Sequence, residues 1–405
     1  MSEILLDRPA ATEESRRLRA ELVGRACEIV PVLARNAATT EAERRVVEEN
    51  ITLIDSAGLF GIMKPKRFGG YETDFRTSLE VSRELARGCG STSWAITLMN
   101  TCSWFLGLFP DRAQRDLWQD LPGNRIAGVL APSAEATRVD GGFRVTGRWG
   151  WASGCLHSQW AVVGIPVPNE LGEIVDQGLV AVPMSELAIE DTWFVAGMRG
   201  TGSNTLVAQD VFVPEHRMIS TPAAVGGRFG TEHTDEPLYR TAFVPGACLV
   251  LAGPQLGLAQ AALDLVVEKA PKRSISYTDY ETQTTAPTVQ LAVAKAATLV
   301  DAAHLHAYRA AADIDQAAAD GVYPDYEARA RVRADTGAAI ENAREAIRVL
   351  VSAHGASSFA ETSPLQRIWR DSEVASRHAV TSPAISAEVY GRAVLGLTDG
   401  VTALV

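Results

Sequence analysis

The segment from residue 124 to residue 220 is the part of this chain that most restricts how the whole can fold. It consists of short β-branched runs separated by Gly, Pro, Asn or Asp, a pattern typical of strands joined by turns. No helical segment separates these runs, so the strands must pair with one another in a small barrel or sandwich. The predicted strands cover Arg125–Leu130, Gly142–Thr146, Trp160–Val167, Gly178–Val182 and Thr205–Val213.

Amphipathic helices are predicted on both sides of this segment, because apolar residues recur there at three- and four-residue spacing. The helices before it cover Glu13–Asn36, Thr40–Ala57, Phe75–Arg87, Trp94–Leu108 and Asp111–Gln119. The helices after it cover Ala247–Ala270, Thr288–Ala319, Tyr326–Ala353, Leu365–Val380 and Pro383–Val394. We expect Ser91, Thr92 or Ser93 to cap the helix that begins at Trp94.

Together these blocks predict an α+β fold with three domains. An N-terminal α-helical domain covers residues 1–122, a central β domain covers 123–221, and a C-terminal domain covers 222–405. Long helices in a row that are joined by turns form up-and-down bundles, so the last domain is predicted to be a four-helix bundle. A chain of 405 residues is long enough for two or three domains of ordinary size.

Charge and composition argue against several kinds of partner. The net charge of −11 disfavours binding to nucleic acid or to an anionic membrane surface. The five cysteines form no C-x-x-C pair and the seven histidines no H-E-x-x-H motif, so we expect neither disulfides nor a metal site. Met1–Glu14 does not have the pattern of a signal peptide, and no long apolar run predicts a membrane-spanning helix. A reducing cytoplasm is the expected location.

Two segments of the β block could bind a planar, phosphate-bearing molecule. Trp149–Cys155 places two tryptophans and then small residues at the end of a strand, where a heterocycle could stack near the Ser153 hydroxyl. The loop Arg199–Asn204 offers backbone amides and hydroxyls to a phosphate. Each segment also has a purely structural interpretation, the first as core tryptophans with a turn, the second as a hairpin turn.

His378 is the histidine with the most distinctive surroundings. It follows Arg370-Asp371 near the end of a predicted helix. Taken alone, it could be a histidine on the helix surface or one that caps the helix C-terminus. A hydrolase pair of Ser153 with His378 has little support, because the chain lacks a G-x-S-x-G motif around the serine.

The order of the blocks and these motifs together resemble the acyl-CoA dehydrogenase fold over nearly the whole chain. The G-x-K-x-W-I-T-N motif of that family corresponds to Gly147–Gly154. By this resemblance, Trp151 takes the place of the tryptophan beside the flavin ring, and Ser153 takes the place of the residue whose hydroxyl bonds flavin N5. Gly154 then belongs to the same flavin site, and Trp193–Arg217 is similar to a second motif of the family.

The chain departs from the common acyl-CoA dehydrogenase pattern near its C-terminus. In that pattern the catalytic glutamate lies eight residues beyond the aspartate of an Arg-Asp pair, which here is Arg370-Asp371. Eight residues beyond Asp371 lies Ala379, with His378 beside it, and the nearest carboxylate upstream is Glu373. The abstraction of an α-proton by a carboxylate is therefore not expected of this chain.

This departure, with Pro364–Asp371 and Cys89–Trp94, resembles the two-component flavin-dependent monooxygenases, group D of that fold. The resemblance implies FMNH2 or FADH2 supplied by a separate NAD(P)H-flavin reductase. It also implies that O2 adds to the flavin as a C4a-hydroperoxide, which hydroxylates a phenolic, polyketide or indole-type aromatic substrate. N-oxygenation of an amino sugar or other amine is the alternative, and acyl-CoA dehydrogenation is a third candidate.

The same resemblance assigns roles to individual residues. Ser153 would slow the loss of peroxide, Trp151 would cover the ring, and His378 would deprotonate a phenol or hold the distal peroxide oxygen. The flavin site would also include Arg370 and Asp371.

The resemblance also implies a homotetramer, a dimer of dimers in which Arg273, Gln283 and the loop with Gly355 and Ala356 reach a neighbour's flavin. Some phenol hydroxylases of this branch carry a histidine in the helix that corresponds to residues 94–108, which this chain lacks, so a larger aromatic substrate is expected. The substrate pocket is predicted to include Trp94, Asn100, Ser103 and Ser133.

Overall fold

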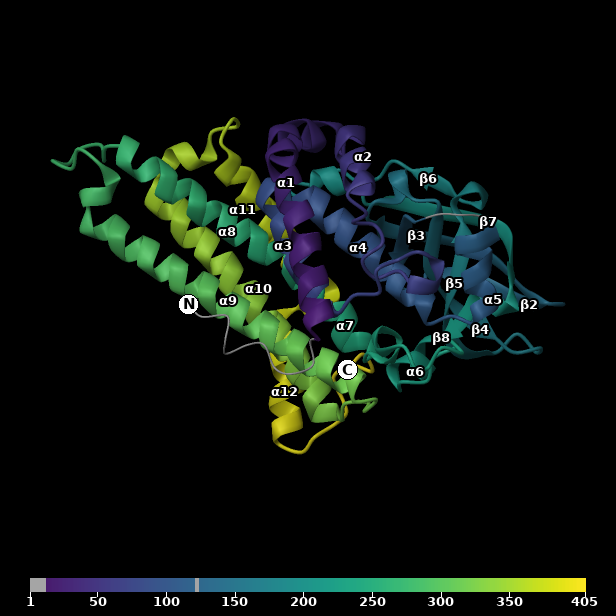
Figure 1. Cartoon of the computed structure of the whole chain (residues 1–405). Coiled ribbons are helices and arrows are strands. Elements are labelled where there is room, and N and C mark those ends of the chain that lie inside the picture. Colours follow the sequence, from purple (N-terminus) through teal and green to yellow (C-terminus); the bar gives the residue numbers. More distant parts are fainter. Residues whose placement is uncertain (1–11, 121–123) are drawn as a thin grey trace.

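The computed structural model describes residues 12–120 and 124–405 of the chain. The predicted boundary between residues 122 and 123 lies outside the described residues, as does most of Met1–Glu14. Helices form the left and centre of Figure 1 and the strands lie at the right, which confirms the predicted order of helical, β and helical regions.

The structure differs from the prediction at the boundary between the first two N-terminal helices. The helices are α1 (Glu13–Glu43), α2 (Glu48–Ser56), α3 (Phe75–Gly88), α4 (Gly90–Gly107) and α5 (Asp111–Arg115). The predicted break after Asn36 is wrong, because Leu33, Ala37 and Thr40 continue one buried face of α1. The helix instead ends where Arg44 adopts a left-handed backbone conformation.

The predicted cap of the Trp94 helix is also wrong. Helix α4 begins at Gly90, directly after Cys89, so Ser91, Thr92 and Ser93 lie inside it and are buried. Their hydroxyls bond neighbouring elements instead, as where Ser93 donates to the carbonyl of Ser82 at 2.6 Å.

Two four-stranded sheets form the β region. One has the order β1-β4-β5-β8 and the other β2-β3-β7-β6, and within them only β1 and β4 pair in parallel. The strands of the first sheet are β1 (Ile126–Val129), β4 (Trp160–Pro168), β5 (Ile174–Pro183) and β8 (Met218–Ser220). Those of the second are β2 (Ala134–Val139), β3 (Gly142–Ala152), β7 (Asn204–Pro214) and β6 (Ala188–Glu190).

The two sheets share one apolar core, to which alternate residues of β3 contribute. Phe143, Val145 and Trp149 are buried in it, and the Trp149 indole donates to the carbonyl of Gly164 on the other sheet at 2.8 Å. Strand β3 runs beyond the predicted Thr146, because its second half pairs with β7. The region is therefore a sandwich, one of the two expected forms.

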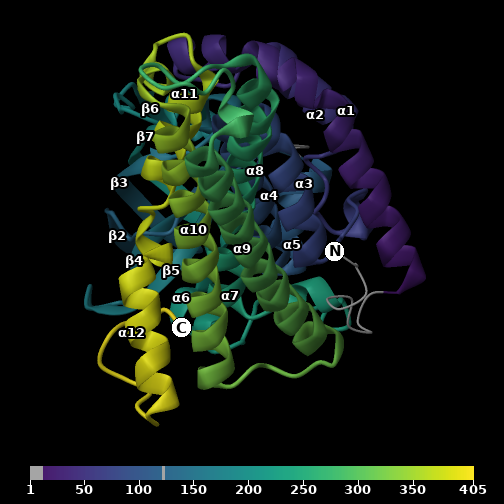
Figure 2. The ribbon, with the colours of Figure 1, turned by 90° about the vertical axis from the view of Figure 1, so that its left-hand side faces the viewer.

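The C-terminal region contains a bundle built from α8 (Ala252–Lys269), α9 (Pro287–Ala319), α10 (Tyr326–His354) and α11 (Pro364–Ala375), which lie side by side in Figure 2. The shorter helices are α6 (Thr221–Val225), α7 (Phe243–Leu249) and α12 (Pro383–Val394). The predicted helix Leu365–Val380 is too long. It ends at Ala375, after which the N–H groups of Arg377 and His378 bond the carbonyls three residues back, and the Val380 carbonyl accepts from Arg333 at 3.3 Å and from the Cys248 thiol at 3.4 Å.

A single hydrophobic core joins the N-terminal helices to the C-terminal ones. Trp104 of α4 packs against Phe75 of α3 and against Phe243 of α7, with ring centroids 5.0 and 5.9 Å apart. Among the described residues, Phe243–Lys272 is the one helical stretch that is apolar and long enough to cross a membrane. Since 67% of its most apolar window is buried within the fold, it has the position of a core helix.

Candidate active site

Ser153 lies where β3 ends, directly after an irregular residue. Trp151 has a left-handed backbone with φ 69°, and the pairing of β3 with β7 shifts register between Trp149 and Ala152. The irregularity turns the Trp151 indole outward, 69% exposed and edge-on to Trp193, with ring centroids 4.9 Å apart. Ser153, two residues after Trp151, is buried.

Gly154 completes this turn and has to be a glycine. Its φ of 75° is the left-handed region that favours glycine, and an added Cβ would lie 2.3 Å from the terminal methyl carbon of Met99. Met99 belongs to α4, so the small residue lets this helix pack directly onto the end of β3. The packing holds Ser153 against α4.

Trp94 of α4 joins Ser153 to His378. The indole Nε1 donates to Ser153 Oγ at 3.3 Å, and the indole lies 5.9 Å from the His378 ring, centroid to centroid, at an interplanar angle of 55°. Three segments far apart in the sequence, the end of β3, helix α4 and the loop after α11, therefore meet at one side chain. The structure brings these three predicted site residues together.

His378 lies in the loop between α11 and α12 rather than on a helix. Its side chain retains accessible surface, while the surrounding protein removes hydration and lowers the pKa of the imidazole to about 4. The ring is neutral above that pH and can accept a proton.

The two nearest carboxylates on α11 are engaged elsewhere. Asp371 is buried and accepts from the backbone N–H of Met198 at 2.6 Å, and burial raises the pKa of this carboxyl to about 6. Glu373 forms an ion pair with Arg377 at 2.6 Å. Neither carboxylate can therefore act as the base that a dehydrogenase would place near His378.

Arg370 and Asp371, both predicted to serve the flavin, hold the loop of residues 196–203 onto α11. The guanidinium of Arg370 bonds the carbonyl of Ala196 and pairs with Glu41 of α1, while Asp371 holds Met198. Gly197 permits this contact, since an added Cβ would lie 2.1 Å from the carbonyl oxygen of Arg370. The loop that precedes β7 is thus fixed relative to the helix that leads to His378.

A second group of predicted residues converges at the end of the bundle remote from the β region (Figure 1). Arg273 donates to Ser357 Oγ at 2.7 Å and to the carbonyl of His354 at 3.4 Å, and its own carbonyl accepts from the N–H of Gln283. Gly355 and Ala356 lie in the same loop as Ser357. Within the described chain, three buried atoms of this cluster, Arg273 Nε, Gln283 Oε1 and His354 Nδ1, have no hydrogen-bond partner.

The remaining residues predicted for the substrate pocket lie apart from Trp94. Asn100, about 240° around α4 from Trp94, donates to the carbonyl of Leu59 at 2.9 Å. Ser103 is buried one turn after Asn100, and Ser133 is exposed ahead of β2. Leu98, one turn after Trp94, is the one partly exposed residue of α4, whose other residues are buried.

Two further residues lie beside Ser153 that the sequence predicted only as part of a candidate phosphate-binding loop. Ser203 Oγ lies 2.7 Å from Ser153 Oγ, and Thr201 Oγ1 lies 2.6 Å from Ser203 Oγ. Both belong to the loop Arg199–Asn204, whose hydroxyls were considered as partners for a phosphate. In the structure the Ser203 hydroxyl bonds that of Ser153, and the Thr201 hydroxyl bonds Ser203 and the carbonyl of Met198.

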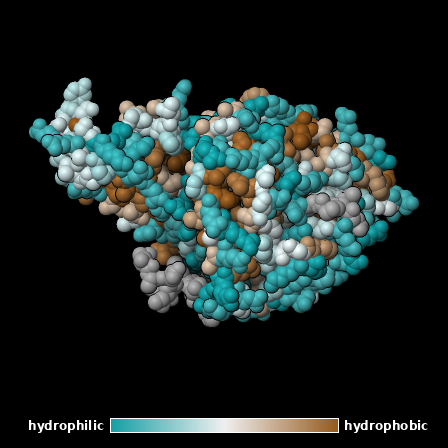
Figure 3. Space-filling model, turned by 45° about the horizontal axis from the view of Figure 1, so that its top comes forward, coloured by the Kyte–Doolittle hydropathy of each residue, from teal (hydrophilic) through white to brown (hydrophobic). Residues whose placement is uncertain are grey.

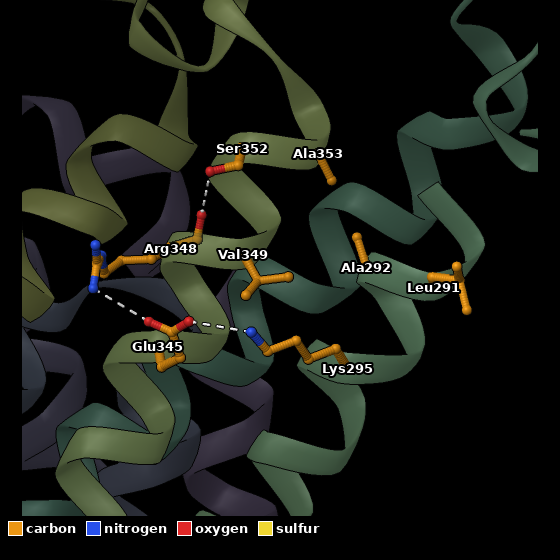
Figure 4. Close-up of a pocket in the computed structure, with 8 residues that line it drawn as sticks. All are labelled: Leu291, Ala292, Lys295, Glu345, Arg348, Val349, Ser352 and Ala353. Carbon is orange, nitrogen blue, oxygen red and sulfur yellow. Dashed lines mark hydrogen bonds and ion pairs between the residues drawn. The ribbon is translucent and has the colours of Figure 1, made fainter. Parts of the chain in front are cut away.

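An open hollow of about 410 Å³ lies elsewhere, between α9 and α10 (Figure 4). Lys295 and Arg348 both pair with Glu345 at its floor, at 3.4 and 3.3 Å. Leu291 at its edge is 71% exposed, and Figure 3 shows that apolar side chains also reach the surface over both the bundle and the β region. None of the residues around Trp94 lines this hollow.

Comparison with known proteins connects this arrangement to flavoenzymes. The acyl-CoA dehydrogenase N-terminal domain family matches residues 12–120, and the acyl-CoA dehydrogenase C-terminal domain family matches residues 249–383. The flavin-dependent monooxygenase oxygenase subunit HsaA of Mycobacterium tuberculosis is 35% identical over 92% of this chain and 95% of its own.

Two further relatives cover almost the whole chain. The oxygenase component of the FADH2-dependent resorcinol hydroxylase of a Rhizobium species is 33% identical over 96% of each chain. The solved structure of XiaF from a Streptomyces species, in complex with FADH2 and glycerol, is 39% identical with a TM-score of 0.90. The alignment covers 96% of this chain and 98% of XiaF.

Proposed function

Because this chain belongs to the two-component flavin-dependent monooxygenases of the acyl-CoA dehydrogenase fold, we propose that Ser153, Trp94 and His378 form its active site. The chain is an oxygenase component that uses reduced flavin and O2 to hydroxylate an aromatic substrate. A separate reductase supplies the flavin. The contact of Trp94 with both Ser153 and His378 is the observation that carries the assignment.

Bound reduced flavin supplies the oxidising chemistry, since it reacts with O2 and transfers one oxygen atom to the substrate. The residues beside Ser153 fit its ring: the Trp151 indole is exposed beside the end of β3, and Gly154 lets α4 pack close enough to hold Ser153 there. Ser153 would bond N5 of the flavin, and Trp151 would cover one face of its ring. The neutral imidazole of His378 accepts the proton of the substrate hydroxyl, which makes the aromatic ring more nucleophilic.

The substrate is a phenol of more than one ring. Relatives are named for aromatic substrates such as resorcinol and indole-3-acetate. In this chain α4 carries no histidine, and Leu98 is its partly exposed side chain nearest to Trp94. An apolar wall of this kind favours contact with a second ring over a hydrogen bond to a small polar substrate.

The functional unit is a homotetramer in the cytoplasm, in which the bundle end of one subunit completes the flavin site of another. The unpartnered atoms of Arg273, Gln283 and His354 support this proposal, because buried polar groups normally have partners. The hollow beside Leu291 offers apolar surface for a neighbouring subunit. The free cysteines support the cytoplasmic location.

An oxygen electrode with product analysis tests the function. The purified chain is mixed with chemically reduced FAD or FMN and a panel of phenols with one, two or more rings. We expect one O2 consumed per hydroxylated product, with the highest kcat/KM for the larger phenols and no reduction of its flavin by acyl-CoA thioesters. Product formed only from amines would contradict the phenol assignment, and a best rate with resorcinol would contradict the proposed ring number.

A further inference from the structure

A chain of buried hydroxyls runs from Trp94 through Ser153 into the loop before β7. The Trp94 indole donates to Ser153 Oγ, which lies 2.7 Å from Ser203 Oγ. Ser203 Oγ in turn lies 2.6 Å from Thr201 Oγ1, and Thr201 donates to the carbonyl of Met198 at 2.8 Å. All five residues are buried, so water does not compete for these bonds.

The last bond of the chain determines the direction of all the others. A carbonyl only accepts, so the single hydroxyl proton of Thr201 is directed to Met198. Ser203 must then donate to Thr201, and Ser153 must donate to Ser203. If Ser203 donated to Ser153 instead, either the bond between Ser203 and Thr201 or the bond from Thr201 to Met198 would have no proton.

This direction leaves Ser153 with one free position, and that position is an acceptor. Its proton is committed to Ser203, and one lone pair is engaged by the Trp94 indole. The second lone pair remains available. Because the chain of bonds ends on a carbonyl, which cannot take up a proton, it fixes an orientation and does not conduct protons.

We propose that the hydroxyl chain Thr201–Ser203–Ser153 makes the site select reduced flavin over oxidised flavin. The proposal rests on the contact between Ser153 and flavin N5 in the proposed function. Reduced flavin carries a proton on N5 and needs an acceptor there, whereas N5 of oxidised flavin is itself an acceptor and needs a donor. A Ser153 held as an acceptor therefore matches only the reduced form. Thr201 and Ser203 are positioning residues that act through Ser153.

Two features of the fold keep the chain of hydroxyls in place. Ser153 follows β3 and Ser203 precedes β7, directly beside the paired residues Ala152 and Asn204. Asp371 holds the N–H of Met198, the residue whose carbonyl ends the chain. The direction of the hydrogen bonds is thus fixed by strand pairing on one side and by helix α11 on the other.

Flavin binding to a Ser203→Ala variant tests the proposal without measuring turnover. Removing the Ser203 hydroxyl frees the Ser153 proton, which can then be donated to N5 of oxidised flavin. We expect the Kd for oxidised flavin to fall about ten-fold, the value of one hydrogen bond, with a smaller change for reduced flavin. Fluorescence titration measures the oxidised form, and anaerobic titration measures the reduced form.

Two variants of Thr201 keep the test decisive if Ser203→Ala does not fold. Thr201→Val removes the hydroxyl that directs the chain and should lower the selectivity for reduced flavin in the same way. Thr201→Ser keeps the hydroxyl and should restore the wild-type ratio. Thr205→Ala is the matched control, since the hydroxyl of Thr205, on β7, bonds that of Thr192 at 2.8 Å and takes no part in the hydroxyl chain.

The outcomes separate this inference from the proposed function. If Ser153→Ala changes neither flavin affinity nor the release of H2O2, the N5 contact itself is wrong. If Ser153→Ala changes them but Ser203→Ala and Thr201→Val leave the affinity ratio as in the wild type, the contact stands and the hydroxyl chain is overturned. An equal change with Thr205→Ala would assign the effect to the strand and also overturn the proposal.

Discussion

At the scale of single residues, Trp94 and His378 distinguish this site from the active site of a dehydrogenase. The indole donates its N–H to Ser153 and lies beside the His378 ring, at a place where neither Asp371 nor Glu373 is free to act. A neutral imidazole in this position can receive a proton from a phenol but does not impose a negative charge on the site.

Replacing His378 by asparagine should reduce hydroxylation about 100-fold, the usual effect of removing an acid–base group. Consumption of O2 by the reduced flavin should continue, so that H2O2 replaces product. Product analysis beside an oxygen electrode measures both quantities. His233→Asn is a suitable control, because that histidine pairs with Asp111 away from this site. Unchanged hydroxylation would remove His378 from the mechanism.

The pH dependence of kcat/KM should report the shifted imidazole. His378 acts as a base only when it is neutral, and its pKa is lowered to about 4. Activity should therefore stay level as the pH falls from 7 to 5 and be lost as it passes through about 4. A histidine of ordinary pKa would lose activity through about pH 6.5. A decline centred there, absent in His378→Asn, would contradict the desolvated ring.

The sequence could identify Ser153 and His378 only through the motifs around them, and it did not predict that Ser203 and Thr201 bond to one another and to Ser153. The pairing of Ser153 with Ser203 spans 50 residues of chain. Its direction depends on Thr201 and on a backbone carbonyl, neither of which a sequence pattern describes. Asn100 has the polarity of a pocket residue, but its position on the helix turns it toward Leu59.

At the scale of elements, α11 connects the two halves of the site. It holds the loop of residues 196–203 through Arg370 and Asp371 and leads directly into the loop of His378. Periodicity predicted this helix but extended it to Val380, whose carbonyl instead accepts hydrogen bonds from Arg333 and Cys248 on other helices. Helix ends of this kind depend on tertiary contacts that the local sequence does not contain.

Replacing Asp371 by alanine should lower the free energy of unfolding by about 1–3 kcal/mol, because it leaves the buried Met198 N–H without an acceptor. The loop with Thr201 and Ser203 should also loosen, so flavin affinity should fall with stability. Thermal unfolding and flavin titration measure the two effects. Asp399→Ala, at an exposed carboxylate, is the control. Wild-type stability of Asp371→Ala would show that the loop is held by other contacts.

At the scale of the whole molecule, the change from helical to β-branched patterns and back predicted the architecture correctly. Those patterns reflect the period of each element and do not depend on distant contacts. The patterns did not reveal that the two helical regions share one core. That core depends on contacts such as Trp104 with Phe243, which join segments far apart in the chain.

The proposed tetramer predicts a particle of about four times the 43.4-kDa chain in light scattering after gel filtration. Leu291→Arg should shift it to a smaller species, because a charge would face the neighbouring subunit. Leu171→Arg is the matched control, an 84% exposed leucine in the turn between β4 and β5. A monomeric wild-type chain, or a tetramer unaffected by Leu291→Arg, would argue against this interface.

The shared helical core has a practical consequence for dividing the chain. A fragment that began at the predicted boundary, residue 222, would contain Phe243 and Tyr239 but not Trp104 or Gly107, whose Cα faces the Tyr239 ring. Such a fragment would expose the apolar surface that these residues cover and should aggregate. The strands, by contrast, have a core of their own. Because the first and last thirds of the chain share one core, we expect them to unfold together as one cooperative unit.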